Sequence, residues 1–390
     1  MKKKISILGS TGSIGLNTIK IINKKKNFFK INILVANKNY KKICNQIDVY
    51  KPNIFIINDE KVFNKVKKKY KNKRVKIYRN LDSKIKNFNS SDITIAAIPG
   101  IAGLIPTLKM IKKSKKILLA NKESIICGWN LIKNVSLQNK TKVIPIDSEH
   151  FSIMKLLENE NKKEISKIYL TASGGPFLKH GIYKLKKVKP TEAIKHPKWK
   201  MGKKISIDSA TLMNKMFEVI EAHKLFSIPQ EKIEVVVHPE SLVHAIIQFK
   251  NGLHKLIYHD TSMIIPLANA IFDGKLDIKE IIGDNDKKDI VFNKLVFLKV
   301  EKDRFPIINL KHRLIEHIST PIIINAANEI LVDQYLKKKI PFMSIYKLIL
   351  SVLRDRNYKK YAIKEPKNIN QILLIDKWSR DTTYRLLKNV

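Results

Sequence analysis

Residues 4–15 read KISILGSTGSIG, and this stretch decides the fold. Its first five residues, 4–8, predict a short strand, and the three glycines that follow predict a turn whose backbone amides stand clear of side chains. An apolar-periodic segment lies at 16–22, and a second apolar run, INILVA, lies at 31–36. A strand, a glycine-rich turn, a helix and a strand within about thirty residues form a βαβ unit that places a pyrophosphate at a helix N-terminus. The sequence therefore predicts an α/β protein with an N-terminal Rossmann-like parallel sheet.

Four further apolar runs extend this sheet. They read as strands at 54–57, 93–98, 116–120 and 143–146, and they alternate with Lys-rich helical stretches. That alternation is typical of an open parallel sheet. From about residue 311 the pattern is helical instead.

The net charge of +42 on 390 residues first suggests a nucleic-acid partner. However, only 8 of the 76 basic residues are Arg, and Lys is spread over the whole length. Nucleic-acid readers usually concentrate Arg and aromatic residues on one face, so we expect no nucleic-acid partner. Cys44 and Cys127 are too few for a disulfide framework or a zinc site, and no apolar stretch is long enough to cross a membrane. We expect a cytoplasmic protein without a membrane partner.

The end of the second strand distinguishes between the two nicotinamide cofactors. Enzymes that use NAD place an acidic residue there to hold the ribose 2′-hydroxyl. This chain reads Ala36-Asn37-Lys38-Asn39, with a cation and no carboxylate, which favours the 2′-phosphate of NADPH. The alternative is that Lys38 is one more lysine of a Lys-rich chain.

Two polar clusters follow predicted strands. VIPI at 143–146 ends in Asp147-Ser148-Glu149, and KILLA at 116–120 ends in Asn121-Lys122-Glu123. In an extended chain Asp147 and Glu149 point to the same side, so they need a cation, a shared proton or open solvent. Ligands of open α/β sheets bind beyond the carboxyl ends of the strands, where both clusters fall. A polar strand end in water is the alternative.

A third carboxylate comes from the stretch ISIDSATLMNKMFEVIEAHKL at 205–225. We expect a strand that ends at Asp208-Ser209, two good N-caps, followed by a helix. Asn214, Lys215 and Glu218 share one face of that helix. Carboxylates at Asp147, Glu149 and Glu218 fit Mg²⁺ or Mn²⁺, whereas Zn²⁺ prefers His or Cys. An exposed Glu–Lys pair on an amphipathic helix is the alternative.

Two loops complete the candidate site. In TASGGPF at 171–177, Ser173 and two glycines form either an anion cradle or an ordinary tight turn. In KHPKWKMGKK at 195–204, an exposed Trp199 suggests a lid over substrate, and His196 either reaches the substrate or lies on the surface. The spacing of the histidines in HPESLVH at 238–244 does not make either of them a ligand.

In this order the motifs resemble one family, the 1-deoxy-D-xylulose 5-phosphate reductoisomerases, NADPH enzymes of the non-mevalonate isoprenoid pathway. The resemblance covers almost the full chain and is carried by ILGSTGSIG, LVANKN, LLANKES, PIDSEH, SGGPF, HPKWKMGKKISIDSATLMNK, HPESLVH and NAANE.

The resemblance implies a homodimer and a three-domain layout. We expect an NADPH-binding domain at 1–146, a catalytic α/β domain at 147–275 with a lid loop at about 184–204, a linker at 276–310 and a helical domain at 311–390. The implied reaction converts 1-deoxy-D-xylulose 5-phosphate into 2-C-methyl-D-erythritol 4-phosphate, with NADPH and one divalent cation, Mn²⁺ or Mg²⁺.

The resemblance also implies the roles of individual residues. Catalysis would rest on Lys122, Glu149, Glu218 and His196. The metal would be bound by Asp147, Glu149 and Glu218. The phosphorylated substrate would be bound by Lys122, Ser148, Glu149, Ser173, His196, Ser209, Asn214, Lys215 and Glu218. The cofactor would be contacted by Thr11, Gly12, Ser13, Ile14, Asn37, Lys38, Asn39, Asn121, Glu123 and Gly202.

Some positions of this chain depart from the family pattern, and two other classes of protein are alternatives to this family. The departures are Asn37 for a glycine, Pro99, Met216-Phe217 for a smaller pair, and the segment 259–262. None of them removes a metal ligand or a phosphate contact.

A basic nucleic-acid-binding protein would leave the three carboxylates unexplained. Another Rossmann enzyme, such as a semialdehyde dehydrogenase, would need a nucleophilic Cys in a polar site, which neither Cys44 nor Cys127 offers.

Overall fold

The computed structural model describes residues 2–81, 88–199, 201–283 and 294–388. The chain forms two compact units, each assembled from separate stretches of sequence. Unit 1 comprises Met1–Ser124, Asn130–Phe151 and Ser262–Asp289. Unit 2 comprises Ile125–Trp129, Ser152–Thr261 and Ile290–Val390.

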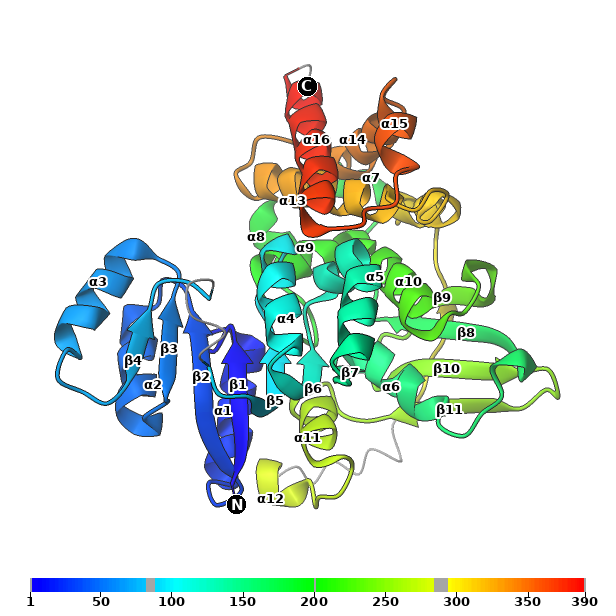
Figure 1. Ribbon diagram of the computed structural model, residues 1–390. Coiled ribbons are helices and arrows are strands. Elements are labelled where there is room, and N and C mark those ends of the chain that lie inside the picture. Colours follow the sequence, from blue (N-terminus) through cyan, green and yellow to red (C-terminus); the bar gives the residue numbers. More distant parts are fainter. Residues whose placement is uncertain (1, 82–87, 200, 284–293, 389–390) are drawn as a thin grey trace. The chain divides into compact units, whose positions relative to one another are not determined.

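Unit 1 is built on a seven-stranded parallel sheet in the order β4-β3-β2-β1-β5-β6-β7 (Figure 1). The strand order turns back at β1, as in doubly wound nucleotide folds. The predicted N-terminal parallel sheet is confirmed. The strands are β1 (Lys3–Leu8), β2 (Phe29–Ala36), β3 (Ile54–Ile57), β4 (Lys76–Tyr78), β5 (Ser91–Ala96), β6 (Ser114–Leu119) and β7 (Lys142–Pro145).

Short polar side chains begin three helices of this unit. Asn39, Asp59 and Asn121 each accept a hydrogen bond from a backbone N–H in the first turn of α2, α3 and α5, respectively. Such caps satisfy amides that have no partner within the helix. The helices are α1 (Ser13–Lys24), α2 (Tyr40–Tyr50), α3 (Glu60–Lys69), η2 (Ile101–Gly103), α4 (Leu104–Ile111), α11 (Ile264–Phe272) and α12 (Lys279–Ile282); α5 (Lys122–Gln138) and α6 (Ser148–Leu156) contribute residues to both units.

A buried lysine fixes α11 to the sheet of unit 1. Lys116 of β6 donates to the carbonyl oxygen of Ala270 and to Asp273 Oδ1, both at 2.8 Å. These acceptors lie at the C-terminal end of α11, where carbonyl groups lack helical partners and a cation is favoured. α11 therefore packs against a sheet whose strands all precede residue 146 in sequence.

Unit 2 contains a five-stranded mixed sheet in the order β11-β10-β8-β9-β12 (Figure 1). β8 and β9 are parallel, whereas β10 runs antiparallel to β8 and β11. The strands are β8 (Ile165–Ala172), β9 (Ile233–Val237), β10 (Val243–Phe249), β11 (His254–Tyr258) and β12 (Leu298–Lys299).

The helices of unit 2 include a C-terminal bundle in which α13 packs against α14 and α16. This bundle confirms the helical pattern predicted from about residue 311. The helices are η3 (Lys162–Glu164), α7 (Ile182–Leu185), α8 (Pro190–Ala193), α9 (Lys203–Thr211), α10 (Met213–Phe226), η4 (Gln230–Lys232), η6 (Pro306–Arg313), α13 (Thr320–Leu336), α14 (Ser344–Leu353), α15 (Tyr358–Ala362) and α16 (Ile369–Leu387).

The strand predicted before Asp208 is wrong. Residues Lys203–Thr211 form α9, and Asp208 is a buried residue within that helix and not an N-cap. The alternation of Ile205 and Ile207 resembles a strand, but a short apolar run does not distinguish between the two structures. Leu212, in the left-handed conformation with φ 64°, separates α9 from α10.

The predicted linker at 276–310 is only partly covered, because residues 284–293 lie outside the described residues. Its described part includes α12, the edge strand β12 and the start of η6. The domain boundaries drawn from the sequence stay predictions. Among the described residues, no helix combines the length and apolar character that a membrane span requires.

Candidate active site

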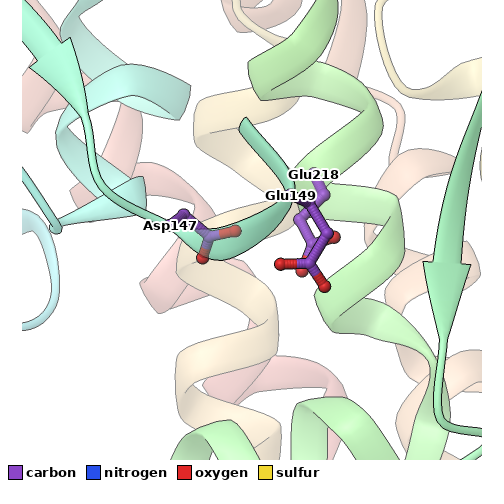
Figure 2. A group of neighbouring side chains, drawn as sticks. All are labelled: Asp147, Glu149 and Glu218. Carbon is purple, nitrogen blue, oxygen red and sulfur yellow. The ribbon is translucent and has the colours of Figure 1, made fainter. Parts of the chain in front are cut away.

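Three carboxylates form the centre of the candidate site. One oxygen from each of Asp147, Glu149 and Glu218 lies within 4.8 Å of the other two (Figure 2). Asp147 lies shortly after β7, Glu149 is in the first turn of α6, and Glu218 is in α10. The convergence predicted for Asp147 and Glu149 is thus present, although the expected extended backbone is wrong, because Ser148 already begins α6. An all-oxygen donor set suits a hard cation such as Mg²⁺ or Mn²⁺.

Asp147 is held in its charged form. Lys122 Nζ lies 3.4 Å from Oδ2, and His150 Nδ1 lies 3.4 Å from Oδ1, which accepts no hydrogen bond. Burial by itself would raise the pKa of this carboxyl, but Lys122 and His150 hold the pKa well below its usual range. A charged oxygen that accepts no hydrogen bond is available to coordinate a cation. Sequence reasoning missed His150, although its i,i+3 spacing from Asp147 at a helix start would have found it.

Glu218 is fully buried, and side chains of its own helix bind both oxygens of its carboxylate. Lys215 Nζ donates to Glu218 Oε2 at 2.6 Å, and Asn214 Nδ2 donates to Oε1. The predicted common face of these three side chains is confirmed. Glu218 is 0% exposed and Lys215 is 6% exposed, so the alternative of an exposed surface pair is wrong. A buried carboxylate is tolerated only with such partners or a cation.

The hydroxyl of Ser173 is set up as a hydrogen-bond donor. His196 Nδ1 accepts from the backbone N–H groups of Lys198 and Trp199, at 3.1 and 2.9 Å, so the ring proton lies on Nε2. His196 Nε2 therefore donates to Ser173 Oγ at 2.9 Å, and the Gly175 N–H donates to the same oxygen at 3.1 Å. With two bonds accepted, Ser173 Oγ keeps its own proton available for donation to another group. Burial, together with Lys215, lowers the pKa of His196 to about 4 and keeps the ring neutral.

The loop of Ser173 lies directly against α9. Gly174 and Gly175 have φ values of 79° and 63°, a region that favours glycine. A Cβ on Gly175 would lie 3.1 Å from both Ser209 O and Ala210 Cα. The backbone at Gly175 therefore lies in close contact with α9 at Ser209 and Ala210.

The predicted lid at 184–204 contains helical turns. Its described residues include the end of α7, all of α8 and the start of α9, and Lys200 lies outside the described residues. The prediction of an exposed Trp199 is wrong, because its side chain is half-buried and makes a T-shaped contact with the His244 ring, at a centroid distance of 6.2 Å. His244 in turn stacks on His259 at 3.9 Å.

The glycine-rich turn of unit 1 has the geometry of a phosphate site. Gly12 precedes α1 and offers no side-chain cap, so the first amides of the helix face outward. Gln46 holds the turn through two hydrogen bonds with Ser10, at 2.7 and 2.9 Å. A Cβ on Gly15 would lie 2.4 Å from Gly9 O, so only glycine allows α1 to approach the turn this closely.

The other predicted cofactor residues lie in two settings. Asn37, Lys38 and Asn39 are exposed directly after β2. Asn121 is buried and donates to Ile98 O at 2.7 Å and to Glu123 Oε2 at 2.9 Å, which ties the ends of β5 and β6 together. Thr11, Gly12, Ser13 and Ile14 lie at the start of α1, and Gly202 precedes α9 in unit 2.

Comparison with family models places almost the whole chain in one group. Residues 5–128 match the model of 1-deoxy-D-xylulose 5-phosphate reductoisomerase. Residues 143–226 match its C-terminal domain, and residues 260–382 match the DXP reductoisomerase C-terminal domain.

Relatives and solved structures agree with this match. A 1-deoxy-D-xylulose 5-phosphate reductoisomerase of Pelagibacter ubique is 45% identical over 95% of this chain and 96% of the relative. The Zymomonas mobilis reductoisomerase in complex with NADPH is 31% identical, with a TM-score of 0.86 and complete coverage of both chains. A reductoisomerase in complex with NADPH, fosmidomycin and magnesium is 30% identical, with a TM-score of 0.90 over 99% of this chain and 98% of the other.

Proposed function

This chain belongs to the 1-deoxy-D-xylulose 5-phosphate reductoisomerase family, and from that membership we propose its reaction. It converts 1-deoxy-D-xylulose 5-phosphate into 2-C-methyl-D-erythritol 4-phosphate, with NADPH as reductant and a divalent cation. This is the first committed step of non-mevalonate isoprenoid synthesis. The observation that carries the proposal is the convergence of Asp147, Glu149 and Glu218 in a chain that also has a nucleotide-binding turn.

Asp147, Glu149 and Glu218 would hold the cation. Their donor set is all oxygen, and Asp147 Oδ1 is buried without a hydrogen bond, so the residues fit the ion. When bound, Mg²⁺ or Mn²⁺ supplies Lewis-acid stabilisation of charge that develops on substrate oxygens. Lys122 and Ser148 would complete this part of the pocket. Lys122 already balances the charge of Asp147, and Ser148 Oγ donates to Glu149 Oε2 at 2.6 Å.

Ser173, Ser209, Asn214 and Lys215 would bind the substrate phosphate. Ser173 offers its O–H, because His196 and Gly175 already fill its acceptor positions. Lys215 supplies positive charge from a buried position. His196 is neutral at physiological pH, so it contributes by fixing the direction of the Ser173 hydroxyl. Binding a phosphate remote from the reacting carbons helps to position them.

The turn before α1 and the loop after β2 would hold NADPH, which supplies the hydride. The outward amides around Gly12 suit the pyrophosphate, and exposed Lys38 suits a 2′-phosphate. We assign the same cofactor contacts as the sequence predicted, namely Thr11, Gly12, Ser13, Ile14, Asn37, Lys38, Asn39, Asn121, Glu123 and Gly202. A homodimer, the use of Mn²⁺ and a cytoplasmic location stay predictions.

A thiol-dependent dehydrogenase is disfavoured by the cysteines. Cys127 is 3% exposed within α5, and Cys44 is 6% exposed within α2. A nucleophilic thiol needs access to substrate and a polar, electropositive setting.

The test is oxidation of NADPH by 1-deoxy-D-xylulose 5-phosphate, followed by absorbance with and without Mn²⁺ or Mg²⁺. Wild type should turn over only with metal, and Glu218→Gln should lose about a hundredfold or more in kcat/KM. Glu221→Gln is the matched control, since Glu221 is 1% exposed on the same helix but lies outside the three-carboxylate group. Turnover that is indifferent to metal and to Glu218 would refute the assignment of the carboxylates.

A further inference from the structure

We propose that Asn328 of α13 is a positioning residue for the substrate phosphate. It acts through Asp208 on α9, the helix that carries Ser209. This inference rests on the proposed function, and it adds the C-terminal helical bundle to the parts of the chain that shape the phosphate site.

The contact between the two helices is a short, buried hydrogen bond. Asn328 Nδ2 donates to Asp208 Oδ1 at 2.7 Å, although the two residues are 120 positions apart. Asn328 is 0% exposed and Asp208 is 1% exposed. A carboxylate can only accept, so it determines which end of the Asn328 amide faces it. A buried hydrogen bond to a charged group is stronger than a neutral one and has little freedom of direction.

Asp208 is held on a second side by its own helix. Lys204 Nζ donates to Asp208 Oδ2 at 2.9 Å, one turn earlier in α9. Lys204 follows closely on Gly202, at the end of the predicted lid. The two oxygens of Asp208 thus join the start of α9 to α13. Loss of the Asn328 donor would leave Oδ1 buried without that partner, which favours a displacement of α9.

α9 has little room to move without changing the phosphate site. Ser209, the next residue after Asp208, lies against Gly175, where a Cβ would meet Ser209 O at 3.1 Å. Gly175 also donates its N–H to Ser173 Oγ. A shift of α9 by a few tenths of an ångström therefore changes how the hydroxyls of Ser173 and Ser209 face a shared anion. α13 also packs against α9, so it helps to hold that helix in place.

The same helix offers a matched control. Asn325 of α13 is also 0% exposed, but its Nδ2 donates within α13, to Glu329 Oε1 at 3.4 Å. Asn325→Ala removes a buried amide from the bundle without removing the hydrogen bond to α9. If Asn325→Ala and Asn328→Ala lose the same amount of stability, that loss reflects the bundle. A defect in phosphate binding that only Asn328→Ala shows reflects the link to α9.

The experiment uses the full chain with metal and NADPH. It measures KM and kcat for 1-deoxy-D-xylulose 5-phosphate, the inhibition constant of inorganic phosphate and the KM for NADPH. Asn328→Ala should raise the KM for substrate and the inhibition constant of phosphate by roughly tenfold, because a displacement of less than 1 Å already weakens an oriented site. The KM for NADPH should stay within about twofold. Asn328→Asp, which keeps the shape but replaces the donor by an acceptor, should show a defect at least as large.

Several outcomes would overturn the inference. A wild-type KM for substrate and a wild-type inhibition constant of phosphate in Asn328→Ala or in Asn328→Asp would do so. An equal rise of the phosphate inhibition constant in Asn325→Ala would also do so. If Asn328→Ala does not fold, Asn328→Ser carries the same test with a smaller change, and a wild-type phosphate constant in that variant counts against the proposal. Absence of turnover in wild type would instead refute the proposed function, so the two failures are distinguishable.

Discussion

Replacing Gly15 by Ala tests whether the nucleotide turn depends on close backbone contact. An added Cβ would lie 2.4 Å from Gly9 O and 2.6 Å from Ser10 Cα, and both of these atoms belong to the backbone. Ordinary contact begins at 3.4 Å, so α1 and the turn must separate by about 1 Å at this point.

Two opposing effects decide the size of the change. Gly15 lies in the first turn of α1, where Ala has a helix propensity better by up to about 1 kcal/mol. Overpacking against a rigid backbone costs about 1–3 kcal/mol, so the free energy of unfolding should fall. A displacement of about 1 Å also misaligns the amides at the start of α1, and affinity for NADPH should drop by roughly tenfold or more.

The assay is a titration of NADPH by its fluorescence, together with urea unfolding of the same preparation. Gly181→Ala is the control, because no atom lies within 4 Å of its added Cβ and its φ is −62°, so both measurements should stay at wild-type values. Wild-type NADPH affinity and an unchanged urea midpoint in Gly15→Ala would refute the reasoning that close packing of α1 shapes the cofactor site.

Two further variants test lysines that are shielded from solvent, Lys116 and the half-buried Lys224. Lys116→Met removes two hydrogen bonds from the end of α11, so the free energy of unfolding measured in urea should fall by about 1–3 kcal/mol. Lys115→Met on the same strand is the control, because that side chain is 80% exposed and its loss should not change the urea midpoint. Equal effects of the two substitutions would contradict the role of Lys116. Lys224 donates to Ile126 O, and burial lowers its pKa from 10.5 to about 8. Between those two pH values the unfolded chain binds more protons, so the stability of wild type relative to Lys224→Met should rise with pH. A flat difference would show that Lys224 titrates normally.

Local patterns predicted the first half of the fold well. The strand at 54–57 has the predicted bounds, and the glycine-rich stretch at 9–15 follows β1 and runs into the first turn of α1. Such elements bury continuous apolar runs or require glycine at defined points, so their signal is contained in neighbouring residues.

Prediction was weaker where a short segment is shaped by distant contacts. Residues 205–208 read as a strand, yet they belong to α9, because Asp208 is bonded by Asn328 and Ile207 is buried in that helical arrangement. Trp199 reads as an exposed lid residue, yet it packs against His244. No local pattern contains these partners.

The parallel nucleotide sheet, the carboxylates available for a cation and the lack of an acidic residue after the second strand follow from residue type and near-neighbour spacing, so they can be read from the sequence. The proton position on His196, the burial of Trp199 and the bond from Asn328 to Asp208 become apparent only in the folded chain. The physical reason is that hydrogen-bond direction and burial depend on groups that the fold brings together from far along the chain.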